Sequence, residues 1–227
     1  MEACELYAKA SERREAGERT ISLDEMTGVQ ALERKHPDLP MQQKKVLRRE
    51  FEYIRHGTIS WFINFDVSTG KVIAPSWGHT RNEADMAAHI QKLIKSDPEV
   101  IKWHLIMDNL NTHQSETLVR FIARMEGVTE DILGVKGKSG VLKSMKTRAA
   151  FLHDSSHKVV FYYTPKHASW MNQVEIFLSI LVRKLLKRGN FLSIDDLRDQ
   201  ILAFLEYYNL TMAKPIKWAY TGIKEAA

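Results

Sequence analysis

The sequence of 227 residues contains a single cysteine, Cys4. One cysteine excludes an intramolecular disulfide and any cysteine-rich zinc site, and it is typical of a protein from a reducing compartment. The chain also lacks a long apolar run, and its first residues are charged, so we expect neither a membrane-spanning helix nor a secretory leader. We therefore expect a cytoplasmic protein that makes no contact with a membrane.

Internal repeats and low-complexity segments are missing as well. Apolar residues make up 44% of the chain and charged residues 27%, a balance typical of a globular domain with one sizeable core. The net charge of +5 is modest, but it is unevenly distributed. The segment 134–148 is basic without any acid, and in the segment 158–190 the only acid is Glu175. A solvated lysine-rich loop explains the first segment as well as contact with DNA does.

Periodicity and turn signals predict an alternation of helices and strands. The first 19 residues have a helical pattern and predict a connector rather than a part of the core, whereas residues 29–50 have two prolines and dense charge and predict an irregular excursion. The clearest hairpin is 59–78, which turns at Ser68-Thr69-Gly70. The remaining predicted elements are a strand at 21–26, a helix at 82–96, a strand at 103–107, a helix at 115–127, a strand at 158–163, a helix from Val174 to Gly189 and a helix at 194–208.

Glu175 lies in the first turn of one predicted helix and has two interpretations. Asn172 is a residue type that favours the N-cap position, and an acid three residues later resembles a capping box. The alternative is a functional carboxylate. Two further acids favour that alternative, because Asp24 lies on the first predicted strand and Asp108 comes directly after the buried strand 103–107. Asp66 sits at the hairpin turn, where local backbone contacts are the expected role.

Carboxylates are the ligands that Mg²⁺ prefers, and three of them can hold two ions that act on a phosphodiester from both sides. Spacing alone does not select these three acids, because the chain has 28 acidic residues and many triples are available. The local sequences are more specific. They are LDEMTGVQALER, YIRHGTISWFINFDVSTGKV, MDNLNTH, YTPKHASWMNQVEIFLSIL and KPIKWAYTG.

These segments, in order from about residue 20 to 222, resemble the DDE-type transposases of bacterial insertion sequences related to the mariner group. The resemblance implies an α/β fold with an RNase H-like core, a mixed sheet of three antiparallel and then two parallel strands flanked by helices. It also implies dependence on Mg²⁺ or Mn²⁺, with two ions per active site, and DNA cleavage followed by strand transfer. Asp24, Asp108 and Glu175 are then the catalytic and metal-binding acids.

The chain departs from that family in two respects. Helix-turn-helix modules that recognise element ends are absent, so an upstream reading-frame product is a candidate partner beside DNA itself. The 67 positions between Asp108 and Glu175 exceed the compact mariner interval, and the basic segment 127–157 predicts a surface insertion. We expect a connector at 1–19, the catalytic domain at 20–210 and a tail at 211–227, with a homodimer or higher assembly on DNA.

Several residues near the three acids are candidates for supporting roles, each with a structural alternative. Asn109, His113, His167, Asn172 and Gln173 are candidates for orienting the metal ligands or contacting phosphate. Trp170 is a candidate for stacking on an unpaired base, although core packing explains it as well. The basic residues expected to contact DNA phosphates are Lys136, Lys138, Lys143, Lys146, Arg148, Lys166, Arg183, Lys184, Lys187 and Arg188.

Two other functions are compatible with these residues. A transposase remnant that binds DNA or an intact copy without cutting is favoured by the absent recognition modules, and the three acids argue against it. A nuclease acting on RNA in hybrids would share the fold, but the motifs resemble transposases.

Overall fold

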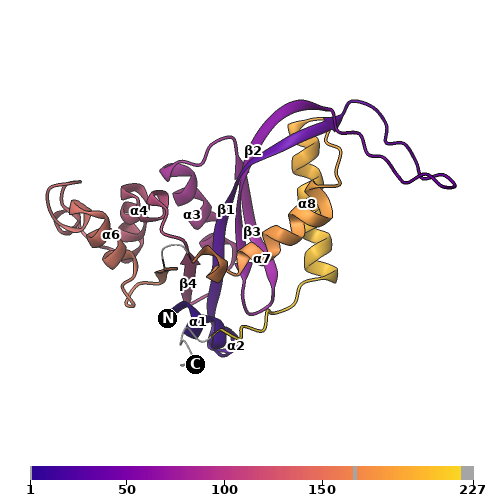
Figure 1. Ribbon diagram of the computed structural model, residues 1–227. Coiled ribbons are helices and arrows are strands. Elements are labelled where there is room, and N and C mark those ends of the chain that lie inside the picture. Colours follow the sequence, from indigo (N-terminus) through magenta and orange to yellow (C-terminus); the bar gives the residue numbers. More distant parts are fainter. Residues whose placement is uncertain (1, 166–167, 221–227) are drawn as a thin grey trace, which may run out of the picture.

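The computed structural model describes residues 2–165 and 168–220, and a five-stranded sheet lies at its centre (Figure 1). The strand order is β3-β2-β1-β4-β5. β1 pairs with β2 and β2 with β3 in antiparallel fashion, whereas β4 runs parallel to β1 and β5 parallel to β4. The predicted mixed sheet is therefore confirmed. Its strands are β1 (Glu18–Arg34), β2 (Tyr53–Asp66), β3 (Lys71–Gly78), β4 (Lys102–Met107) and β5 (Val159–Tyr163).

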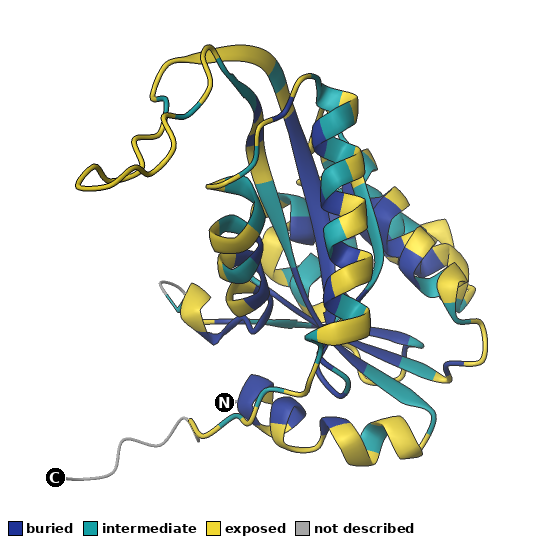
Figure 2. Ribbon diagram, turned by 90° about the vertical axis from the view of Figure 1, so that its right-hand side faces the viewer, coloured by how far each residue is buried: buried dark blue, intermediate teal, exposed yellow. Residues whose placement is uncertain are grey.

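Helices cover both faces of the sheet, and each face has its own apolar core. On one face, α3 (Glu83–Ser96), α4 (Glu116–Glu126) and α6 (Met145–Leu152) pack against residues such as Ile21 and Leu23 of β1. On the other face, α7 (Val174–Leu181) and α8 (Ile194–Thr211) pack against β1 and β2. The strands between these layers are largely buried (Figure 2). No helix in the described ranges is both long and apolar enough to cross a bilayer.

Helix ends follow the predicted signals closely on the α3–α4 side. Asn82 caps α3 by accepting hydrogen bonds from the backbone N–H groups of Ala84 and Asp85, and the Asp85 side chain bonds back to the N–H of Asn82. Gly127 follows α4 with a φ of 70°, a left-handed conformation that glycine adopts without strain.

The prediction of one connector helix over the first 19 residues is wrong. The segment forms two short helices, α1 (Glu2–Ala8) and α2 (Ala10–Glu15), and β1 already begins at Glu18. Leu6 and Tyr7 of α1 are buried and pack with Ile106 of β4, so the apolar stripe of this segment belongs to the core.

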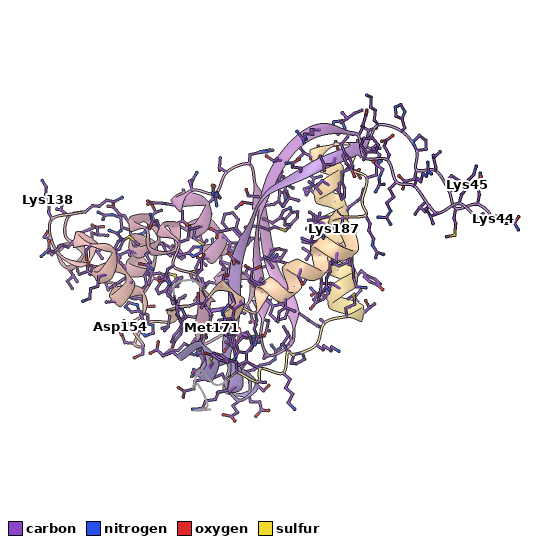
Figure 3. All side chains as sticks on the ribbon, viewed as in Figure 1. Lys44, Lys45, Lys138, Asp154, Met171 and Lys187 are labelled. Carbon is purple, nitrogen blue, oxygen red and sulfur yellow. The ribbon has the colours of Figure 1, made fainter. Side chains whose placement is uncertain are left out.

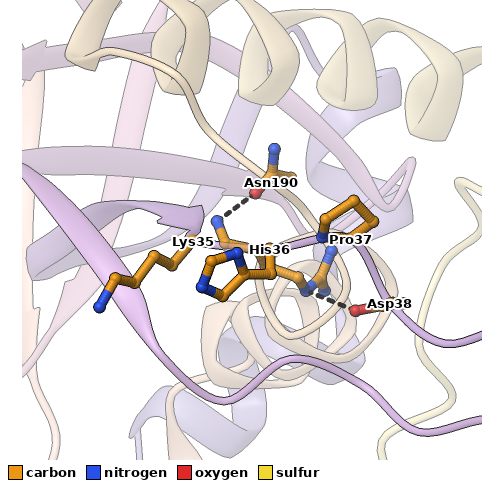
Figure 4. A pocket seen from close by; sticks show the side chains of 6 residues that line it. Lys35, His36, Pro37, Asp38 and Asn190 are labelled. Carbon is orange, nitrogen blue, oxygen red and sulfur yellow. Dashed lines mark hydrogen bonds and ion pairs between the residues drawn. The ribbon is translucent and has the colours of Figure 1, made fainter.

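The irregular excursion predicted at 29–50 is shifted. β1 continues to Arg34, and the irregular part is residues 35–52, which we call the arm. The arm projects far from the sheet, is mostly exposed, and has Lys44 and Lys45 at its tip (Figures 1, 2 and 3). Its base is tied to the loop before α8, because the backbone N–H of Arg34 donates to the side-chain oxygen of Asn190 (Figure 4).

The basic segment 127–157 is folded rather than a simple surface insertion. It contains α5 (Glu130–Leu133) and α6, and three of its leucines, Leu133, Leu142 and Leu152, are fully buried in the core beneath α4. Its lysines remain exposed, with Lys138 at the outer end (Figure 3). The segment is therefore attached by its apolar residues and presents its charge to solvent.

Candidate active site

The register of the two central parallel strands brings Asp24 and Asp108 together. Ser22 of β1 pairs with Ile106 of β4. Asp24 follows Ser22 by two residues, and Asp108 follows Ile106 by two residues. Because the two strands are parallel, the backbones of Asp24 and Asp108 are neighbours. Asp108 lies at the end of a core strand, where the sequence predicted functional side chains.

Glu175 reaches the same region through contacts between β1 and the start of α7. The hydroxyl of Ser22 accepts a hydrogen bond from the backbone N–H of Val174 at 2.8 Å and donates to the side-chain oxygen of Asn172. The amide nitrogen of Asn172 donates to the carbonyl oxygen of Leu23 at 2.9 Å and lies 3.5 Å from Oδ2 of Asp24. These buried contacts fix the first turn of α7 over β1, next to Asp24.

The capping interpretation of Asn172 and Glu175 is wrong. The N-cap position of α7 is Gln173, and its side chain accepts no hydrogen bond from the first turn of the helix. Asn172 has its side chain turned into β1, so it cannot cap the helix as well. Glu175 therefore has no capping role. Its side chain is exposed, and among the described residues its carboxylate has no hydrogen-bond partner.

The negative charges of the three acids influence one another's pKa. Burial raises the pKa of Asp24 to about 7, and the charges of Asp108 and Glu175 add to that rise. Burial and the charge of Asp108 also raise the pKa of Glu175. The pKa of Asp108 is lowered instead, because it accepts a hydrogen bond from His113. The site is thus an uncompensated cluster of negative charge on the α7 side.

His113 contacts both Asp108 and a further acid, Glu25, which the sequence analysis did not include in the site. Its Nδ1 lies 2.8 Å from Oδ1 of Asp108, and its Nε2 lies 2.9 Å from Oε2 of Glu25. Burial opposes protonation of His113, but its hydrogen bonds to the two acids prevail and raise its pKa to about 10. The alternation of side chains along β1 predicts that Glu25 faces away from Asp24, and nothing in the sequence indicates its partner.

The other predicted supporting residues have mixed placements. Asn109 donates its side-chain amide to the carbonyl oxygen of Thr164 and accepts from Gln114, so it joins β4 to β5 at the site. Gln173 is fully buried, and its side-chain atoms have no hydrogen-bond partner among the described residues. His167 and Lys166 lie outside the described residues.

Asp66 has the structural role expected of a turn residue. Its carboxylate accepts hydrogen bonds from the backbone N–H and the hydroxyl of Ser68 and pairs with Arg14 at 2.9 Å. All of its contacts lie at the β2–β3 turn and on α2, and none involves the three acids.

A groove of about 530 Å³ opens beside Glu175. Met26 and Thr27 of β1 form one wall, and residues of α7 and of the π-helical turn that continues it, Val182–Leu186, form the other. Arg183 and Lys187 lie at its rim (Lys187 in Figure 3). The hollow at the base of the arm, drawn in Figure 4, contains none of the three acids.

The predicted DNA-contacting residues fall into three groups. Arg183, Lys184, Lys187 and Arg188 are exposed, and two of them, Arg183 and Lys187, line the groove. Lys136, Lys138, Lys143 and Lys146 are exposed on the folded basic segment. Arg148 differs, because its guanidinium donates to the carbonyl oxygens of Gln114 and Leu142. Trp170 is exposed and packs edge-on against Tyr220, so core packing does not explain it.

The donor set suits a hard divalent cation, although the described side chains are not yet gathered around one. Within residues 2–165 and 168–220, no three His, Cys, Asp or Glu side chains lie close enough to hold an ion between them. Carboxylate oxygens are what Mg²⁺ and Mn²⁺ prefer, and burial together with the charges of Asp108 and Glu175 raises the pKa of Asp24. The residues therefore fit such a cation by their chemistry.

Comparison with known proteins decides the family. A model of the DDE superfamily endonucleases matches residues 19–198, most of the chain. The chain belongs to this family. The match includes the strands and helices that carry Asp24, Asp108 and Glu175. No curated protein matches the sequence of this DDE endonuclease chain.

Solved structures support the same fold. The Mos1 mariner paired end complex with Mn has a TM-score of 0.55 at 12% identity, covering 91% of this chain and 53% of the other. The Mos1 strand transfer complex gives 0.55 at 13% identity, with 90% and 52% covered. The isolated catalytic domain of Mos1 mariner transposase gives 0.52 at 11% identity, with 90% and 78% covered. The chain thus has the mariner catalytic fold and spans about half the length of the Mos1 chains in those complexes.

Proposed function

We propose that the chain is the catalytic domain of a DNA transposase, which cleaves DNA at the ends of a mobile element and joins them to target DNA. The observation that carries this proposal is the meeting of Asp24 and Asp108 on neighbouring parallel strands, with Glu175 beside them at the start of α7. Family membership supports it, and so does the fold of the Mos1 complexes, which contain paired transposon ends.

In this proposal Asp24, Asp108 and Glu175 hold Mg²⁺ or Mn²⁺, two ions when the site is full. The ions would activate the attacking oxygen and stabilise the leaving oxygen of an in-line displacement at phosphorus. The protein positions the acids through Ser22, Asn172 and His113, and the phosphodiester is exchanged without a covalent enzyme intermediate. Mos1 was crystallised in its paired end complex with Mn, which supports the choice of metal.

The substrate would approach along the groove beside Glu175. Arg183 and Lys187 at its rim can contact phosphates, and such contacts position DNA without reading its sequence. We propose that Lys184 and Arg188 extend this surface and that assembly on two element ends needs a second copy of the chain. Arg148 is left out of the surface, because it already bonds two backbone carbonyls.

The experiment is cleavage and joining by the purified chain. Supercoiled plasmid DNA is incubated with Mg²⁺ or Mn²⁺, and nicked and joined products are separated on denaturing gels. Wild type should nick and join, and Asp24→Asn, Asp108→Asn and Glu175→Gln should each lose both products. Glu206→Gln, on the exposed side of α8, is the matched control and should retain them. Equal nicking by the three site variants would reject the proposal.

A further inference from the structure

Glu25 and His113 form a buried link between the two central strands. Glu25 follows Asp24 on β1 but points to the opposite face of the sheet, where its side chain is 3% exposed. His113 lies five residues after Asp108 and is 0% exposed. The link therefore connects the backbone of β1 next to Asp24 with the side chain of Asp108.

The contacts on Asp108 are directed to one oxygen. Oδ1 lies 2.8 Å from Nδ1 of His113 and accepts the backbone N–H of Leu110 at 3.0 Å. The same Nδ1 lies 3.0 Å from the carbonyl oxygen of Asp108. No hydrogen bond to Oδ2 occurs within the described residues, so one oxygen orients the carboxylate and the other is left for a ligand.

The turn that carries His113 is itself fixed from two sides. The hydroxyl of Tyr163 on β5 donates to the carbonyl oxygen of His113 at 3.0 Å. Nε of Arg148 donates to the carbonyl oxygen of Gln114 at 2.6 Å. The backbone of this turn is fixed, and the His113 ring is bonded to both Glu25 and Asp108. The ring therefore has little freedom to turn, as expected of a residue that orients a metal ligand.

We propose that Glu25 and His113 are positioning residues that hold the Asp108 carboxylate ready for the divalent cation. This inference rests on the proposed function; it adds Glu25 and states how His113 acts on Asp108. Neither residue touches substrate or metal. They act through Asp108, and the loss of such a partner typically weakens metal affinity by about 10- to 100-fold.

The chain offers a matched control for this pair. Glu18 and His104 join the same two strands, with Nε2 of His104 lying 2.7 Å from Oε2 of Glu18. That pair lies toward the other end of the two strands, because Glu18 begins β1 and Thr20 pairs with His104. It is the same pair of residue types, with Arg13 as an additional partner of both, and it contacts none of the three acids.

The test is Mn²⁺ binding by calorimetry, using MnCl₂ alone. Removing a single partner would leave a buried charge unpaired, so both are replaced by apolar residues in Glu25→Met with His113→Leu. This double variant should bind Mn²⁺ about 10- to 100-fold more weakly than wild type. Glu25→Gln keeps an acceptor for Nε2 and should lose less Mn²⁺ affinity than the double variant does. Glu18→Met with His104→Leu should bind as wild type does.

Wild-type affinity in the folded Glu25→Met, His113→Leu variant would overturn the positioning role and leave the proposed metal site intact. Failure of the wild-type chain to bind Mn²⁺ would overturn both. A second measurement needs no variant of the pair. The ¹⁵N resonances of the His113 ring should shift on titration with Mg²⁺, whereas those of His104 stay in place. In Asp108→Asn the His113 shift should vanish. Unmoved His113 resonances in Mg²⁺-bound wild type would overturn the positioning role.

Discussion

The side-chain amide of Asn172 donates to the carbonyl oxygen of Leu23 across 2.9 Å, although 149 positions separate the two residues. This bond attaches the segment before α7 to β1 one residue before Asp24. The same side chain accepts from Ser22, so three consecutive residues of β1 are placed relative to α7 by one amide.

Asn172→Ala should therefore reduce both stability and metal affinity. The buried hydroxyl of Ser22 and the carbonyl of Leu23 lose their partner, which costs about 1–3 kcal/mol in the free energy of unfolding. Urea denaturation and Mn²⁺ calorimetry measure the two effects. Asn209→Ala is the control, because Asn209 bonds both backbone groups of Val72 away from the acids. It should lose similar stability and no Mn²⁺ affinity, and an equal loss of affinity in both variants would contradict the prediction.

Glu175→Gln should abolish strand cleavage and leave the fold intact. Replacing the carboxylate removes one charge from three that repel one another, so the melting temperature without metal should be unchanged or higher. Differential scanning calorimetry without metal and cleavage assays with Mg²⁺ or Mn²⁺ check the two parts. A variant that nicks DNA at the wild-type rate would remove Glu175 from the site.

The metal-free protein should lose stability as pH rises from about 4 to 7. The pKa of Asp24 is about 7 in the folded chain and near 3.8 in the unfolded chain, so in this window the folded state binds the extra proton. The stabilising contribution of the Asp24 proton is fully present below the pKa of the unfolded chain. It is lost as pH rises through the pKa of the folded chain. Asp24→Asn should match wild type near pH 4 and exceed it at pH 7, by about 1.4 kcal/mol per pKa unit at most. Parallel stability profiles of the two proteins would contradict this.

The raised pKa of His113 extends the same trend to higher pH. Its value is about 10 in the folded chain and 6.5 in the unfolded chain, so its stabilising contribution is present below 6.5 and lost as pH rises toward 10. Urea unfolding of wild type between pH 6.5 and 10 should show this loss. The Glu25→Met, His113→Leu variant should show a flatter profile, and an equally steep one would contradict the assignment.

DNA binding by this chain should be mainly electrostatic. The logarithm of affinity should fall with the logarithm of salt concentration, with a slope near −0.9 for each phosphate contacted. Replacing Lys184, Lys187 and Arg188 by alanine should flatten that slope by about two to three. Lys95→Ala, on α3 at the other face of the sheet, is the control. Tight binding that is independent of salt and selective for one sequence would contradict the prediction.

Local patterns predicted the elements well, because the residues that start and end them act nearby. Asn82, Gly127 and the turn 68–70 lie where the sequence indicated an end or a turn. Asp24, Asp108 and Glu175 were selected through their motifs rather than through spacing. Strand register brings Asp24 and Asp108 together, and the contacts of Ser22 place the start of α7 beside them. Asn172 was a candidate for orienting the acids, but its partners could not be foreseen, because they are 148–150 positions away. The Glu25–His113 contact was missed for the same reason.

The first helix shows how far the catalytic unit extends. The hydroxyl of Tyr7 donates to the carbonyl oxygen of Met171 at 2.8 Å, and the backbone N–H of Gln173 lies 3.4 Å from the same hydroxyl. Met171 and Gln173, on either side of Asn172, are thus both hydrogen-bonded to the side chain of Tyr7 on α1. A shortened version that starts at β1 would keep Asp24, Asp108, Glu175 and every strand, yet lose the support beneath the segment that aligns the three acids. Anyone trimming this protein for crystallisation or fusion should retain α1.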